Sequence, residues 1–268
     1  MTRQRGSPIK WAGSKTLSAS QIMPLLDFER PYIEPFCGSA TFFFKKRPKY
    51  SHLNDSNPAL ISFYQELCRD PAEVWSAYND TPIDEHTYYE KRKEFNELES
   101  GTRKASLFLY LNHYGFNGIY RTNKKGELNT PYGARTKARK KMSFEEVFDY
   151  SELLKCTTLY CGDFEDFLKN LSPEGCCIYM DPPYFTDDSR VFGEYGAQTF
   201  KGLDLKRLFD VTTQLVAAQN MVVISYKDCT EFRDIFGSSV QSEITVQRNV
   251  GGFAGRRKTD QELVAIFK

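Results

Sequence analysis

The 268-residue sequence has no long hydrophobic run and almost no net charge. No stretch approaches the roughly 20 apolar residues that a membrane helix needs. The basic residues near the amino terminus are not followed by an apolar segment, as they would be in a secretory signal. A hydrophobic content of 40% is nevertheless enough for a large core. We therefore expect a globular cytoplasmic protein that is not inserted in a membrane.

Cysteine pairs at metal-ligand spacing are also lacking. The seven cysteines are odd in number, and Cys176 and Cys177 are adjacent in an apolar run. His52, His86 and His113 are scattered along the chain. The pattern predicts reduced, packed thiols and no metal site.

The net charge is only +1, so no overall field indicates a polyanionic partner. Basic residues nevertheless cluster between Arg121 and Lys141, where Glu127 is the one acidic residue. A solvated surface explains most such runs, but aromatic residues are interspersed here, which favours nucleic-acid binding. The aromatic residues are Tyr114, Phe116, Tyr120 and Tyr132, and a second basic cluster is Arg256, Arg257 and Lys258.

The order of apolar segments predicts an α/β core. Apolar periodicity predicts strands at 31–36, 49–54, 157–161, 176–181, 220–226, 240–248 and 261–267, and helices at 143–154, 163–170, 203–218 and 228–236. Residues 57–142 have the pattern of successive helices followed by a hairpin near 123–126. We expect a catalytic core formed by 1–56 and 143–268, interrupted by a recognition domain at 57–142.

Asp181-Pro182-Pro183-Tyr184 follows the apolar run 176–180 and is the most informative motif. A carboxylate, a rigid turn and an aromatic ring at the carboxyl end of a strand suit binding of an amino group on a flat ring. A stiff turn alone would also explain two consecutive prolines. The motif by itself names neither the ring nor its partner.

Three other features are ambiguous when taken alone. Asp55, after the second predicted strand, is placed to bind two ribose hydroxyls or simply to cap the next helix. The segment Lys10–Lys15 holds a Trp that either packs on a ligand or is buried beneath lysines. The small-residue loop Glu34–Ala40 lacks the Gly-Lys-Ser/Thr of a phosphate-binding loop.

Taken together and in order, these motifs resemble the Dam-type family of DNA adenine methyltransferases, the D12 class. The resemblance rests on Lys10–Lys15, Glu34–Ala40, Asn54–Asp55, Leu109–Gly118 with Arg121, Pro131–Gly133 and Asp181–Tyr184, and continues through Val222–Ser225 and Gln261–Leu263. It implies a Rossmann-like, S-adenosylmethionine-dependent methyltransferase core. It also implies S-adenosylhomocysteine as product, no metal, and the N6 amino group of a flipped adenine in double-stranded DNA as acceptor.

The resemblance also assigns residues. Trp11, Lys15, Phe36, Asp55, Phe164 and Asp181 would bind the methyl donor, and Asp181, Pro182 and Tyr184 would hold the target base. Lys10, Asn117, Arg121 and Arg135 fall where the family contacts DNA. Ser14 and Ala40 replace glycines that the family usually has, and we expect both turns to survive. The segment 185–198 does not match the family, so its role is open.

Three alternatives remain at the level of sequence. The first is the same fold acting on the N4 amino group of cytosine. The second is a catalytically silent DNA-binding regulator built on the same scaffold. The third is RNA as the substrate in place of DNA. Many relatives act at GATC, but resemblance does not fix the target site or the biological role, whether repair, restriction-modification or phage defence. No obligate protein partner is implied, and we expect a monomer.

Overall fold

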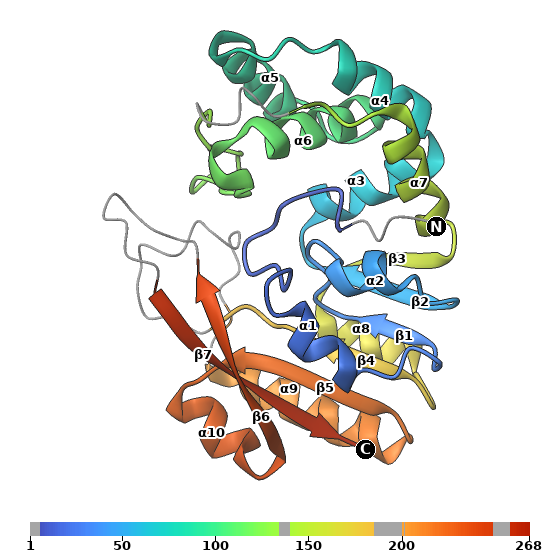
Figure 1. Cartoon of the computed structure of the whole chain (residues 1–268), viewed down its shortest axis with the longest axis vertical. Coiled ribbons are helices and arrows are strands. Elements are labelled where there is room, and N and C mark those ends of the chain that lie inside the picture. Colours follow the sequence, from blue (N-terminus) through green and yellow to red (C-terminus); the bar gives the residue numbers. More distant parts are fainter. Residues whose placement is uncertain (1–5, 134–139, 185–199, 201, 249–257) are drawn as a thin grey trace.

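The computed structural model describes residues 6–133, 140–184, 200, 202–248 and 258–268. It contains one mixed sheet with a group of helices beyond one end of it (Figure 1). The strands are β1 (Tyr32–Glu34), β2 (Ser51–Asp55), β3 (Thr157–Cys161), β4 (Cys177–Met180), β5 (Met221–Lys227), β6 (Val240–Arg248) and β7 (Lys258–Phe267).

The strand order is β3-β2-β1-β4-β5-β7-β6. Strands β1 to β5 pair in parallel, while β7 runs antiparallel to both β5 and β6. The prediction of a Rossmann-like α/β core is therefore confirmed. All seven predicted strands form, and the largest difference is that β7 begins at Lys258 and not near residue 261.

Helices fall where apolar periodicity and capping residues place them. Asn57 caps α3 by accepting hydrogen bonds from the backbone of Ala59 and Leu60. Ser143 and Glu146 form a reciprocal capping box at the start of α7. The helices are α1 (Ala19–Ile22), η1 (Met23–Leu25), α2 (Thr41–Lys46), α3 (Pro58–Arg69), α4 (Pro71–Asp80), α5 (Glu85–Glu97), α6 (Thr102–Tyr114), η2 (Phe116–Gly118), α7 (Phe144–Leu154), α8 (Phe164–Leu171), α9 (Gly202–Ala217), α10 (Thr230–Phe236) and η4 (Gly237–Ser239).

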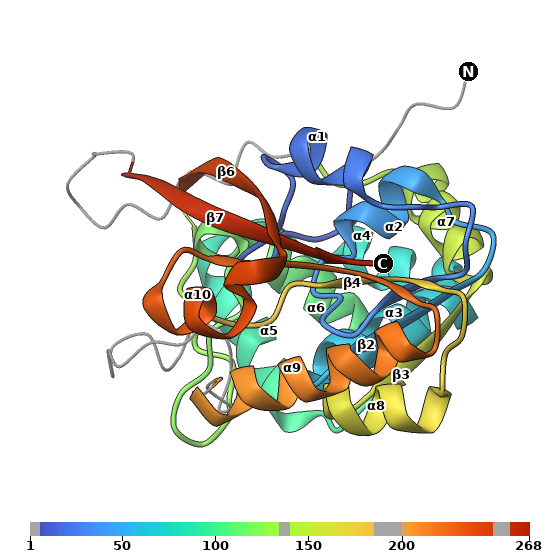
Figure 2. The same ribbon diagram turned by 90° about the horizontal axis from the view of Figure 1, so that it is seen from below.

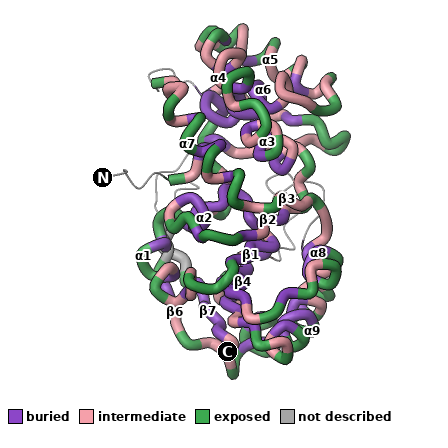
Figure 3. The backbone as a smooth tube through the Cα atoms, turned by 90° about the vertical axis from the view of Figure 1, so that its right-hand side faces the viewer, coloured by how far each residue is buried: buried purple, intermediate pink, exposed green. Residues whose placement is uncertain are grey.

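Both faces of the sheet are buried, because alternate residues of each strand join different hydrophobic clusters. Tyr32 and Tyr179 pack on the side of α1, α2 and α3, whereas Ile33 and Ile178 pack on the side of α8 and α9. Figure 2 shows these helices on opposite sides of the strands, and Figure 3 shows that the central strands are buried. The sheet is thus a rigid support for the loops at its edge.

Helices α3, α4 and α5 pack around α6, and α7 packs against α3 and α4. Residues Ala105–Tyr114 of α6 are all buried, so this helix forms the centre of the group. The hydrophobic cluster of these helices continues into the sheet. The division into a core and a recognition domain at 57–142 therefore stays a prediction. The expected hairpin is marked by an antiparallel bridge between Thr122 and Leu128.

The strand order reverses between β1 and β4, which are neighbours in the sheet. The chain leaves β1 toward β2 on one side, and β4 leads to β5 on the other. Loops after such neighbouring strands separate and leave a crevice at their carboxyl ends. The segments 35–40 and 181–184 both start at this point.

Candidate active site

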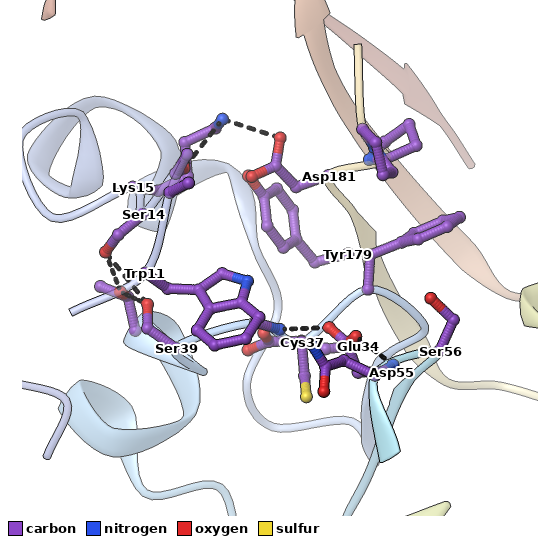
Figure 4. A pocket seen from close by; sticks show the side chains of 18 of the residues that line it. Trp11, Ser14, Lys15, Glu34, Cys37, Ser39, Asp55, Ser56, Tyr179 and Asp181 are labelled. Carbon is purple, nitrogen blue, oxygen red and sulfur yellow. Dashed lines mark hydrogen bonds and ion pairs between the residues drawn. The ribbon is translucent and has the colours of Figure 1, made fainter. Parts of the chain in front are cut away.

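A pocket with an empty volume of about 900 Å³, including its open mouth, lies at the carboxyl ends of β1, β2 and β4. Figure 4 shows its side chains converging from segments far apart in the sequence. The pocket is lined by Trp11–Lys15, Glu34, Phe36–Ser39, Thr41, Phe42, Asp55–Asn57, Tyr120, Tyr179 and Asp181–Tyr184. The structure thus brings the predicted Trp11, Lys15, Phe36, Asp55, Asp181, Pro182 and Tyr184 into one site.

Trp11 forms one wall of the pocket. Its ring stacks on Tyr120 at 5.5 Å between ring centroids and on Phe108 at 6.3 Å. Gly38 lies directly against it, with a positive φ of 46°. A Cβ atom on Gly38 would come within 2.7 Å of Trp11 Cδ1. Since only glycine fits both the backbone angle and the space, Gly38 and Trp11 set the width of this wall.

Ser14 joins the two loops that surround the pocket. Its hydroxyl lies 3.0 Å from both Ser39 Oγ and Thr41 Oγ1, and 2.9 Å from Thr16 Oγ1 (Figure 4). The expected turn survives the replacement of glycine, because the Ser14 amide donates to the Trp11 carbonyl at 3.1 Å. The serine therefore adds a hydroxyl cluster that a glycine would not supply.

Ala40 also stands where the family often has glycine, and it adopts the left-handed conformation with φ 48° and ψ 44°. An L-residue in this region costs about 1–2 kcal/mol. Its backbone amide still donates to the Cys37 carbonyl at 2.6 Å, so the turn that begins α2 survives.

Asp55 is anchored by the backbone of both neighbouring loops. Its carboxylate accepts a 3.0 Å hydrogen bond from the Gly38 amide and a 2.9 Å bond from the Asn57 amide. The alternative that the segment Asn54–Asn57 caps the next helix is confirmed, but through Asn57 and not through Asp55 itself. Burial raises the pKa of the Asp55 carboxyl, while these two amide bonds lower it. The remaining lone pairs of Asp55 face the pocket that it lines.

Lys15, Asp181 and Tyr184 form a buried polar network on the other side of the pocket. The Lys15 ammonium lies 2.7 Å from Asp181 Oδ1 and donates to the Tyr184 hydroxyl at 3.0 Å. Asp181 also accepts from Ser225 Oγ at 3.2 Å. Burial raises the pKa of Asp181 above its usual range, although Lys15 lowers it. At Lys15 burial lowers the pKa of the ammonium, but Asp181, Tyr179 and Glu262 together outweigh burial and raise this pKa above its usual range.

Glu34 is a second buried carboxyl group in the pocket lining, only 3% exposed. It accepts a 3.3 Å hydrogen bond from the backbone amide of Phe43. Burial raises its pKa to about 8, because this bond offsets only part of the desolvation of the carboxylate. Glu34 is therefore mostly protonated at neutral pH.

Phe36 lines the pocket, whereas Phe164 lies behind it. The two rings are 5.0 Å apart, and Phe164 is 4% exposed. The Arg207 guanidinium covers the Phe164 ring at 4.9 Å and pairs with Asp163 at 2.6 Å. Phe164 thus supports Phe36, and its predicted contact with the donor stays a prediction.

The residues expected at DNA gather near the end of α6. Buried Asn112 accepts from the Lys10 amide at 2.9 Å and donates to the Lys10 carbonyl at 2.7 Å. It also donates to the Gly118 carbonyl at 3.2 Å. Asn117 directly precedes Gly118 in η2 and has φ 55°. Lys10 and Asn117 are therefore held together, 107 residues apart in the sequence.

Arg121 is exposed and lies on the hairpin that follows. Its guanidinium donates to Asn129 Oδ1 at 2.8 Å and to the Asn129 carbonyl at 3.3 Å. Arg135 and the segment 185–198 lie outside the described residues. Phe116, next to Asn117, exposes 49% of its surface, which is unusual for a phenylalanine.

Several site residues were given no role in the pocket from the sequence. Tyr120, noted there only among the aromatic residues of the basic run, and Tyr179 line the pocket. Glu262, which is 2% exposed, accepts a 2.6 Å hydrogen bond from Tyr184. Glu262 and Asn112 lie in the quoted segments Gln261–Leu263 and Leu109–Gly118. Their roles were not predicted, because their partners are distant in the sequence.

The described residues show neither a metal-binding cluster nor a membrane-spanning helix. No group of three or more His, Cys, Asp or Glu in them is arranged to hold a metal ion. In the same part of the chain, no helix has the length and apolarity needed to cross a membrane.

Comparison with known proteins gives consistent matches. The family model described as D12 class N6 adenine-specific DNA methyltransferase matches residues 11–250. The DNA adenine methylase of Escherichia coli K12 is 30% identical over 265 residues, covering 97% of this chain and 94% of that protein. The DNA adenine methylase of Vibrio cholerae serotype O1 (strain O395) is 31% identical over 279 residues, covering 100% and 97%. The Retron Ec67 DNA adenine methylase of Escherichia coli is 30% identical over 264 residues, covering 96% and 90%.

Proposed function

Because this chain belongs to the D12 class of N6 adenine-specific DNA methyltransferases and methylates adenine in DNA, we propose that its pocket binds S-adenosylmethionine beside a flipped adenine. The donor would occupy the side formed by Trp11 and Asp55, and the base the side formed by Asp181 and Tyr184. Lys15 lies between the two sides.

The residues present fit the donor. The ring of Trp11, packed directly against Gly38, gives the pocket a flat apolar wall that suits a flat or apolar group. Asp55 is anchored at the end of β2 and retains acceptor capacity for ribose hydroxyls. Lys15 supplies a cation for the donor carboxylate. When bound, S-adenosylmethionine supplies an electrophilic methyl group.

Asp181 would act on the acceptor. The lone pair of the adenine amino nitrogen is delocalised into the ring, so the nitrogen is a poor nucleophile. A hydrogen bond to Asp181 and a second to a main-chain carbonyl near Pro182 favour a tetrahedral nitrogen with a localised lone pair. The Asp181 carboxyl group accepts this bond most strongly when it is ionised. Holding both reactants in place supplies roughly 7–11 kcal/mol of the barrier reduction.

The acceptor would be a base in double-stranded DNA. Its amino group is inaccessible inside the duplex, so the base must leave the stack at a cost of a few kcal/mol. Tyr184 offers an aromatic face to offset this cost. Lys10 directly precedes Trp11 and Arg121 directly follows Tyr120, and Trp11 and Tyr120 both line the pocket. Lys10 and the hairpin with Arg121 would position the duplex. We propose a monomeric cytoplasmic enzyme that acts at GATC or a related site.

One observation carries this proposal: the Asp181–Tyr184 motif and the Trp11–Lys15 segment line a single pocket with Asp55. The residues proposed to hold the donor are all present in this pocket, which argues against a silent DNA-binding regulator. Sequencing methylated plasmid DNA at single-molecule resolution would identify the target site, and digestion to nucleosides would identify the modified base.

Asp181→Ala tests the mechanism. We expect the single-turnover methylation rate to fall by at least about 10²–10³, with DNA binding in a gel-shift assay largely retained. Asp228→Ala, which removes a half-buried carboxylate paired with Arg233 outside the pocket, is the matched control. A near wild-type rate for Asp181→Ala would rule out this role for the carboxylate.

A further inference from the structure

Glu262 is a buried carboxylate behind the acceptor side of the pocket. It lies on β7, faces the same side of the sheet as Val264 and Ile266, and is 2% exposed. Its Oε1 atom accepts from the Tyr184 hydroxyl at 2.6 Å and lies 3.4 Å from Lys15 Nζ. Its Oε2 atom is buried without a hydrogen-bond partner among the described residues.

A buried carboxylate such as Glu262 lowers the free energy of unfolding. Burying a carboxylate with one oxygen unsatisfied opposes folding, and an apolar residue at this place in the strand would avoid that cost. The neighbouring positions Leu263, Val264 and Ala265 are apolar. Stability alone therefore does not account for an acid at position 262.

Lys15 is shared between two carboxylates. Its ammonium is 2.7 Å from Asp181 and 3.4 Å from Glu262. A carboxylate that is fully engaged by a buried lysine has less capacity to accept a hydrogen bond from a base. A second carboxylate lets Lys15 remain paired while Asp181 turns to another donor. The unpartnered Oε2 atom leaves room for Lys15 to strengthen its bond to Glu262.

Tyr184 depends on the same acid. Its hydroxyl donates to Glu262, and its ring meets Tyr226 edge-on at 5.2 Å between centroids. A tyrosine held at both its hydroxyl and its ring edge has little freedom to rotate. The face of the ring is thereby fixed beside Pro182 and Pro183 in the pocket wall.

We propose that Glu262 is a positioning residue for methyl transfer: it fixes the Tyr184 ring and offers Lys15 a second partner, so that Asp181 can accept the adenine amino group. This inference rests on the proposed roles of Asp181 and Tyr184. It assigns Glu262 no direct contact with the base or the donor.

Glu262→Gln tests the proposal, because glutamine keeps the shape and can still accept from Tyr184 but removes the charge. We expect the single-turnover rate at saturating donor and DNA to fall about tenfold or more, while the donor Kd measured by calorimetry changes by no more than about threefold. Tyr184→Phe should lower the rate through loss of orientation, and the double variant should be less impaired than the product of the two single effects.

The pH profile separates positioning from a merely structural role. The negative charge of Glu262 raises the pKa of Asp181, so Glu262→Gln should displace the acid limb of kcat/KM to lower pH. A structural role would lower the melting temperature and the rate without displacing the limb. The titratable groups that face Glu262 or lie opposite it in the sheet are Lys15, Asp181, Tyr184, Tyr179 and the exposed Lys227.

Glu243→Gln is the matched control, since Glu243 lies on the adjacent strand β6, is 55% exposed and pairs with Arg233. It should leave the rate and the pH profile unchanged. A wild-type rate and an unmoved acid limb for Glu262→Gln would overturn this inference while leaving the proposed function intact. Failure of the unmodified protein to produce N6-methyladenine would instead overturn the proposed function.

Discussion

Gly38→Ala is the substitution whose effect the structure defines most closely. Gly38 has φ 46°, and an alanine there costs about 1–2 kcal/mol in backbone conformation. The added Cβ would also lie 2.7 Å from Trp11 Cδ1, against about 3.5 Å for a relaxed contact. Overpacking of this kind costs typically 1–3 kcal/mol. We therefore expect a total loss of about 2–5 kcal/mol in the free energy of unfolding.

The clash should also weaken donor binding. Trp11 cannot retreat freely, because it is stacked on Tyr120 and Phe108. Gly38 itself donates to Asp55 and accepts from the Tyr64 hydroxyl at 2.9 Å, so its backbone is also held. We expect the Kd for S-adenosylmethionine to rise about tenfold or more, equivalent to about 1.4 kcal/mol.

The assay combines urea denaturation with donor titration followed by Trp11 fluorescence. The chain has two tryptophans, and Trp75→Phe removes the other one, whose indole donates to the Met142 carbonyl outside the pocket. Gly175→Ala is the control, because Gly175 has φ 65° but nothing within 4 Å of its would-be Cβ. Equal losses of stability in Gly38→Ala and Gly175→Ala, with unchanged donor affinity, would refute the packing argument.

Two further predictions follow from the described contacts. Glu34 has its pKa raised to about 8, so the folded state binds a proton that the unfolded state has released, and the free energy of unfolding falls as pH rises between about 4.5 and 8. Glu34→Gln should flatten this dependence by up to about 1.4 kcal/mol per pH unit in urea denaturation, and parallel curves for the two proteins would contradict it. Arg121→Ala should relax discrimination at one base position by about 1–3 kcal/mol in methylation of variant sites, whereas a uniform loss would indicate phosphate binding.

Much of the fold could be predicted from the sequence because its strands contain apolar residues in runs or in alternation, with clear ends. The strands at 157–161 and 240–248 form over the predicted residues. The start of β7 could not be placed, since Lys258, Thr259 and Asp260 are polar and pair with β6 through their backbone. Residues that follow β1, β2 and β4 were expected to share one site from the family resemblance, and they line one pocket.

The partners of the site residues could not be predicted. Whether Asp55 caps a helix depends on which side chain reaches the α3 amides, and Asn57 does so. The sharing of Lys15 between Asp181 and Glu262 depends on how the turn at Lys15 and the end of β4 pack against β7, three segments far apart in the sequence. Local patterns carry no information on such pairings, because they reflect only neighbours a few residues away.

The contact between Lys15 and Glu262 spans 247 residues of sequence. At roughly 5–20 residues per second, a ribosome needs about 12–50 s to make the intervening chain. The loop with Trp11 is therefore synthesised long before β7 exists to complete the polar network around Asp181. In a nascent chain, helices α1 to α10 would be synthesised before β7 supplies Glu262 to the polar network. The acceptor side of the pocket, where Glu262 holds Tyr184, would thus be completed only when β7 joins the sheet.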